Sequence, residues 1–230
     1  MDIDNFQEDN KNVLHSYLFA QQANPHAAHE ALMNALWEFG RPFDLKPKEK
    51  LSLGSENEYQ IILLKYGVFS LCRFNDDLSV LPIFSPSVVG LIDAYSKTYN
   101  VPIKPENYLV AETNCQGRAV SLADFLRVTE ECHLWHDVAR ILAYRLLVMN
   151  VRDRELVGVD SYQKVRSLLI EIWAYSAEYR QSIHVLNFIQ RRTGLSRSRT
   201  LKLLSELKKG GYINIDNGRL LEIKKLPMAY

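Results

Sequence analysis

The sequence predicts an α+β protein in which a β-rich antiparallel domain is followed by one long helix and a winged helix-turn-helix. Three patterns lead to this prediction. They are short apolar runs separated by turns over residues 50–119, a heptad repeat that starts at Ser121, and a helix–turn–helix–hairpin pattern at the C-terminal end. We expect a β-rich domain, a long helix with a hinge and a C-terminal domain at residues 1–120, 121–158 and 159–230.

The composition, with 47% hydrophobic and 24% charged residues, is that of an ordinary soluble globular protein. No apolar run approaches the roughly 18 residues needed to cross a bilayer, so we expect no membrane contact. The acidic N-terminus differs from a secretory leader. Cys72, Cys115 and Cys132 are too scattered for a disulfide framework or a paired-cysteine zinc site. These features predict a cytoplasmic protein without a metal or other cofactor.

The net charge of +1 conceals a strong asymmetry along the chain. Residues 181–230 contain ten Lys and Arg against three acidic residues, a net charge of +7, and the rest of the chain carries −6. A basic block attached to an acidic body indicates that the C-terminal end binds a polyanion.

The first half of the chain changes from a helical to a β-type pattern. Residues 1–50 read as helical, with Pro25 at a helix start. Residues 59–65, 68–74 and 78–84 read as strands separated by turns. Hairpins this short and regular favour a small antiparallel barrel or jelly roll.

From Ser121 onward apolar residues recur at spacings of three and four, the pattern of a coiled coil about 36 Å long. A second apolar stripe (Leu134, Val138, Ile141, Val148) runs beside it, so one side of this helix would cover its own β-rich domain and the other would meet a second copy. The alternative is a buried core helix in a monomer. The predicted dimer seam consists of Phe125, Val128, Cys132, Trp135, Ala139, Leu142, Leu146 and Met149.

Cys132 occupies a core position of this heptad pattern, so in a parallel dimer it would face its own copy. We expect an inert packing residue, because free cysteine usually behaves as a small buried hydrophobe. The alternative is an oxidation switch in which a bridge between the two Cys132 residues changes DNA affinity.

Beyond a hinge at Gly158 the pattern predicts helices over residues 161–173 and 182–192. A tight turn and a Ser196 cap then lead into a helix that ends at Lys209. An Asn-Gly pair at residues 217–218 is a strong hairpin signal. This order is that of a winged helix-turn-helix.

A helical wheel of the last helix places Thr200, Leu201, Leu204 and Leu207 on the inner side, with Leu203 at the margin. Long donors in its first turn can reach guanine edges in the major groove, and its free N–H groups can bind a phosphate. Basic residues before the turn and on the wing suit backbone contacts. The predicted DNA-contacting residues are Arg191, Arg192, Ser196, Arg197, Ser198, Arg199, Lys202, Ser205 and Arg219.

The segment beginning at Gly194, GLSRSRTLKLLSELKKGGYI, resembles the recognition-helix segment of the Crp/Fnr superfamily without gaps. The resemblance extends over residues 27–223, and its nearest subgroup is the enterobacterial regulators typified by the inhibitor of hydrogen peroxide resistance. It implies a cyclic-nucleotide-binding-like jelly roll as sensor domain and a dimerisation helix. It also implies a homodimeric transcription regulator on double-stranded DNA, with RNA polymerase as a candidate partner. Arg197 and Lys202 would then touch bases, whereas Ser198 replaces a glutamate of well-known members, so their operator preference does not carry over.

The predicted sensor domain departs from members of this superfamily that bind cyclic nucleotides. Those members use a Gly-Glu pair and a later Arg-Ser or Arg-Ala pair, but residues 88–97 keep only the glycine. A buried phosphate without a guanidinium partner is strongly destabilised, so we expect no cyclic-nucleotide binding. Three scattered cysteines also exclude a four-cysteine iron–sulfur site.

Two other functional classes account for parts of the sequence. An adaptor whose winged helix binds protein would present a neutral or acidic face, and this face is basic. An enzyme would need a catalytic constellation, and the sequence contains no recognisable one. His133 and His136 share a helix face with Cys132, but a solvated face explains them better than a metal site.

Overall fold

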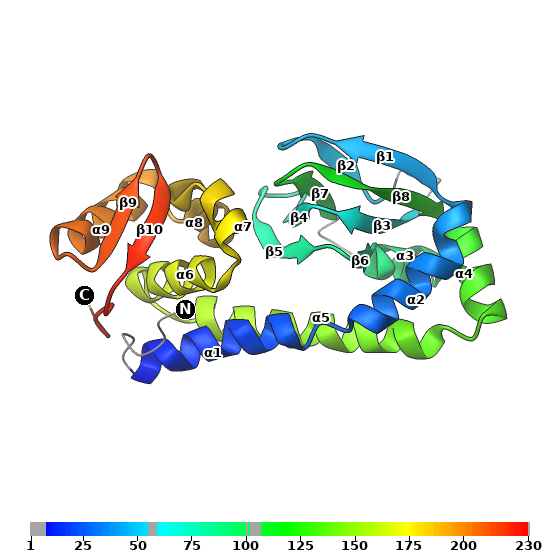
Figure 1. Cartoon of the computed structure of the whole chain (residues 1–230), viewed down its shortest axis with the longest axis horizontal. Helices are drawn as coiled ribbons and strands as arrows, with labels where there is room; N and C mark the ends of the chain where they lie inside the picture. The colour runs from blue at the N-terminus through cyan, green and yellow to red at the C-terminus, as the bar shows by residue number, and fades with distance from the viewer. Residues whose placement is uncertain (1–7, 55–58, 100, 102–106, 230) are drawn as a thin grey trace. The chain divides into compact units, whose positions relative to one another are not determined.

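The computed structural model describes residues 8–54, 59–99, 101 and 107–229 of the chain. The contacts divide it into two compact units, residues 24–146 (the sheet unit) and residues 1–23 together with 147–230 (the C-terminal unit). Figure 1 shows how the elements are arranged inside each unit. The N-terminal helix α1 therefore groups with the C-terminal unit, whereas the sequence pattern placed it in the β-rich domain.

Two four-stranded antiparallel sheets form the sheet unit, in the orders β1-β8-β3-β6 and β2-β7-β4-β5. This arrangement confirms the predicted antiparallel class, and helices cover one of the sheets. Its elements are α2 (His26–Leu36), a 3-10 turn η1 (Trp37–Phe39), β1 (Arg41–Leu45), β2 (Lys50–Ser52), β3 (Gln60–Tyr66), β4 (Val68–Arg73), β5 (Ser79–Phe84), β6 (Ser87–Val89), α3 (Leu91–Thr98), β7 (Asn107–Ala111), β8 (Cys115–Ser121), α4 (Leu122–Glu131) and α5 (Trp135–Leu156).

The helical pattern of residues 1–50 stops at Gly40-Arg41-Pro42, in agreement with the structure, but it does not reveal the individual strands β1 and β2 that begin at Arg41 and Lys50. Both strands are short and largely exposed, so neither shows the apolar alternation that reveals a strand in sequence. β1 pairs with β8 alone among the described strands, and this edge position tolerates Pro42.

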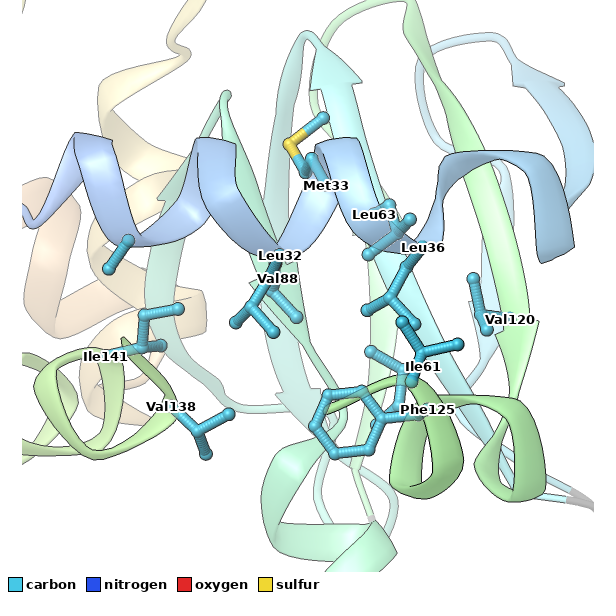
Figure 2. Packing of buried hydrophobic residues seen from close by; sticks show 12 residues of the cluster. Leu32, Met33, Leu36, Ile61, Leu63, Val88, Val120, Phe125, Val138 and Ile141 are labelled. Atoms are coloured by element: carbon cyan, nitrogen blue, oxygen red, sulfur yellow. The ribbon is translucent and has the colours of Figure 1, made fainter. Parts of the chain in front are cut away.

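The centre of the sheet unit is built on β3, whose residues Ile61 to Leu64 are all fully buried. Successive side chains on a strand point to opposite faces. Ile61 and Leu63 pack beneath α2, α4 and α5 together with Leu32, Leu36 and Phe125 (Figure 2). Burial on both faces explains why this strand reads as a continuous apolar run.

His29 of α2 is a polar residue that is completely buried in this unit. Its Nδ1 accepts a hydrogen bond of 3.1 Å from the backbone N–H of Val88. Burial, with smaller contributions from the positive charges of Arg145 and His26, lowers the pKa of His29 to about 3. The imidazole is therefore neutral at physiological pH.

This pKa predicts a loss of stability in mild acid. An unfolded histidine takes up a proton near pH 6.5, but the folded state resists protonation down to about pH 3. Stability is therefore complete above pH 6.5 and falls as the pH decreases toward 3. We expect urea unfolding to show that the wild type loses about 2 kcal/mol more than His29→Gln between pH 7 and pH 5. The exposed His26→Gln is the control, and equal losses for wild type and His29→Gln would contradict the prediction.

The prediction of one continuous helix from Ser121 to Met149 is wrong. α4 ends at Glu131, and the chain turns through Cys132 and His133, whose φ of 56° is left-handed, before α5 begins at Trp135. Phe125 and Val128 are buried in the core of their own unit, so they cannot belong to a dimer seam in this conformation. Cys132 lies exposed at this bend and not at a buried heptad position.

The C-terminal unit contains α1 (Glu8–Gln22), the last part of α5, α6 (Ser161–Ala174), α7 (Ala177–Ser182), α8 (Val185–Thr193), α9 (Arg197–Lys209), β9 (Ile213–Asp216) and β10 (Arg219–Ile223). α1 packs against α6 through buried polar contacts. The fully buried Asn10 donates to the carbonyl of Leu226 at 3.0 Å and accepts from Nε of Arg166 at 2.7 Å. α1 is thus an integral part of this unit.

Candidate nucleic-acid interface

The turn between α8 and α9 has the predicted chemistry. Gly194 ends α8 with a left-handed φ of 69°, and its N–H donates to the carbonyl of Gln190 at 2.9 Å. Ser196 caps α9, and its Oγ accepts a hydrogen bond from the N–H of Arg199 at 3.2 Å. These local bonds fix the direction in which α9 leaves the turn.

α9 buries one face in the unit and exposes the other. Its buried residues are Thr200, Leu203, Leu204 and Leu207. Leu203 therefore lies inside and not at the margin, whereas Leu201, which the helical wheel placed inside, is 44% exposed. A helical wheel based on apolar character alone therefore predicts a buried face that is rotated toward Leu201 and away from Leu203.

The opposite face of α9 carries the residues that the sequence predicted for DNA contact. Both arginines of the first turn are exposed, and Lys202 lies one turn further on, 4.0 Å from a carboxylate oxygen of Glu206. The exposed residues of the capped helix start and of this face are Ser196, Arg197, Ser198, Arg199, Lys202 and Ser205. The structure thus leaves six of the nine predicted contact residues exposed on α9 and its cap.

The wing is the β9–β10 hairpin, closed by Asn217 and Gly218 with left-handed φ values of 47° and 78°. This pair of values is typical of the tight turn that an Asn-Gly sequence predicts. The carbonyl of Gly218 accepts from the N–H of Val185 at 2.8 Å, so the wing is joined to the start of α8. Arg219 is exposed at the start of β10, next to this turn.

Arg192 is the predicted contact residue that the structure places elsewhere. Its side chain is 3% exposed and lies 3.0 Å from the carboxylate of Glu171 on α6, which also accepts from the hydroxyl of Tyr175. Arg192 therefore holds α8 against α6 inside the unit, and Arg191 beside it is half-buried. The spacing of Val185, Ile189 and Arg192 puts Arg192 on the inner stripe of α8, a signal that could have revealed its position.

Two buried tyrosines surround this ion pair. Burial, followed by the negative charge of Glu171, raises the pKa of Tyr175 and of Tyr17 well above 10. Both hydroxyls therefore stay protonated. Since Tyr17 comes from α1, the N-terminal helix lies close to the groups that fix the position of α8.

The part of the predicted dimer seam that lies on α5 is uncovered in the single chain. Trp135, Leu142 and Leu146 are 42%, 37% and 64% exposed. Ala139 is also exposed, Met149 is half-buried, and the neighbouring stripe with Val138 and Ile141 is buried. α5 thus covers its own sheet unit with one stripe and leaves the other free.

Residues 88–97, which the sequence compared with a cyclic-nucleotide site, form the end of β6 and most of α3. Gly90 has a φ of 101°, and a Cβ there would lie 2.7 Å from the carbonyl of Gln60, so a glycine is required. Several α3 side chains, that of Lys97 among them, lie outside the described residues.

In the described parts of the chain, no three His, Cys, Asp or Glu side chains are grouped to hold a metal ion. None of the helices described is both long and apolar enough to cross a bilayer.

Comparisons with known proteins identify the family. Residues 161–228 match a family model described as winged helix-turn-helix DNA binding. Over 201 residues the chain is 31% identical to the inhibitor of hydrogen peroxide resistance of Escherichia coli, which covers 86% of this chain and 94% of that protein.

Solved structures with low sequence identity share the fold. The c-di-GMP responsive global regulator CLP of Xanthomonas campestris is similar with a TM-score of 0.64 at 15% identity, over 86% of this chain and 100% of that chain. A transcriptional regulator of the Crp/Fnr family from Eubacterium rectale is similar with a TM-score of 0.66 at 13% identity, over 84% of this chain and 90% of that chain. The chain therefore belongs to the family of the inhibitor of hydrogen peroxide resistance and has the fold of the Crp/Fnr winged-helix regulators.

Proposed function

We propose that this chain is a sequence-specific DNA-binding transcription regulator that acts as a homodimer in the cytoplasm and binds no cyclic nucleotide. The observation that carries the proposal is the exposed face of α9, where Arg197, Lys202 and the Ser196 cap lie on one surface. A helix of this kind enters the major groove with its first turn against the base edges. Contact with RNA polymerase is a further expectation of the superfamily resemblance.

The uncovered apolar side chains of α5 support the proposed homodimer. Leu142 and Leu146 are exposed although Val138 and Ile141 of the stripe beside them are buried. An apolar stripe at heptad spacing is buried when two such helices pair. A two-fold dimer would place two copies of α9 on successive turns of a roughly palindromic site.

A gel-shift experiment with random genomic fragments tests the DNA-binding proposal. We expect some fragments to be retained preferentially, with an affinity that falls linearly in log–log form as salt is raised. Retention of no fragment at low salt would contradict the proposal. Equal retention of all fragments would contradict sequence specificity alone.

The two kinds of basic residue should respond differently to truncation. We expect Arg197→Ala and Lys202→Ala to lose about 1–3 kcal/mol of specific binding while weak nonspecific binding persists, because their donors read base edges. Arg191→Ala and Arg219→Ala should weaken binding to all sequences alike and reduce the salt slope, because these residues suit phosphate contacts. Equal losses on every sequence for all four variants would contradict this division.

A further inference from the structure

α9 presents one large apolar side chain on the face that the proposed function turns toward DNA. Leu201 is 44% exposed, whereas the three other leucines of this fully described helix are buried. Arg197 and Ser205 lie four residues before and four residues after it, so all three share one side of the helix. Leu201 thus lies between exposed polar residues along this side of the helix, next to the buried face that carries Leu204.

The side chain of leucine limits what Leu201 can recognise. It has no donor or acceptor, so it cannot pair with the polar edge of a base. Burying such an edge against it would leave a base donor or acceptor without a partner, which is unfavourable. The one apolar group that a base pair presents in the major groove is the C5-methyl group of thymine.

We propose that Leu201 contacts a thymine methyl group and so fixes a thymine in each half-site of the operator. This inference rests on the proposed function, because it requires α9 to lie in the major groove. Arg197 and Lys202 supply hydrogen bonds to bases on either side of this contact. Leu201 is therefore a specificity residue that acts through shape and apolar contact.

Deoxyuridine provides a direct test, since it pairs like thymine and lacks only the methyl group. A preferred duplex is first selected from a random library with the wild-type protein. Each thymine of one half-site is then replaced in turn by deoxyuridine, and affinity is measured by fluorescence anisotropy at one salt concentration. We expect one replacement to weaken wild-type binding about fourfold, the value of one buried methyl-sized group. For Leu201→Ala the same replacement should change affinity less than about 1.5-fold, because the methyl group has lost its partner.

Leu221→Ala is the matched control, because Leu221 is similarly exposed but lies on the wing. We expect this variant to keep the wild-type response to deoxyuridine. The inference is overturned if no single replacement weakens the wild type, if Leu201→Ala responds as the wild type does, or if the selected half-site contains no thymine. Failure to select any sequence would instead overturn the proposed function, and the inference with it.

Discussion

Replacing Arg192 with methionine lowers the free energy of unfolding by about 3–5 kcal/mol, one of the largest single-residue effects expected in this chain. Arg192 and Glu171 form an ion pair at 3.0 Å whose side chains are almost completely buried. Removing the guanidinium leaves the Glu171 carboxylate in the interior with a tyrosine hydroxyl as its described partner. Urea unfolding followed by fluorescence, in a background where Trp37 and Trp135 are replaced by Phe so that Trp173 of α6 reports on this unit, measures the loss.

Two further variants separate this interior role from a DNA contact. Arg199→Met removes an exposed arginine of α9 and should change stability by less than about 0.5 kcal/mol. A double variant, Glu171→Gln with Arg192→Met, should recover part of the lost stability because no uncompensated charge remains. If Arg192→Met is as stable as Arg199→Met and weakens DNA binding instead, the phosphate contact expected from the sequence is right and the interior role is wrong.

The helix-turn-helix and the wing could be predicted from sequence because their signals are local. Gly194, Ser196 and the Asn217–Gly218 pair each determine the backbone within a few residues of themselves. Each residue type is favoured there for a conformational reason that tertiary packing does not override. The turn, the cap and the wing can therefore be predicted from these few residues alone.

Non-local packing explains what the sequence did not reveal. The position of α1 depends on Asn10 meeting Arg166 and Leu226, which are more than 150 residues away along the chain. Neither partner is signalled near Asn10. Arg192 was misplaced for a related reason: arginine is usually exposed, and its burial depends on Glu171 of another helix.

The heptad pattern failed at one point because spacing does not distinguish one helix from two. Phe125 and Trp135 stand at regular heptad positions, yet a left-handed His133 separates their helices. Their rings still contact each other edge to face within one chain, with the ring centroids 6.3 Å apart. The first residues of the predicted dimer seam are therefore buried within a single chain. The exposed part of the seam begins at Trp135.

Placing a glutamate at Leu142 or Leu146 should convert the protein to a monomer and reduce its affinity for a two-half-site operator at least about 100-fold. Both leucines are exposed in the single chain, so a charge there should change monomer stability by less than about 0.5 kcal/mol. In a parallel dimer each glutamate would face its own copy, which buries two like charges at a cost of several kcal/mol. Without dimerisation the second half-site is no longer bound at a high effective concentration, which removes a factor of about 10² to 10⁴ in affinity.

Tyr66→Glu, at an exposed site of the same unit away from α5, is the control and should remain dimeric. Analytical ultracentrifugation and anisotropy decide the matter: a dimeric Leu146→Glu with unchanged DNA affinity would show that α5 is not the dimer seam.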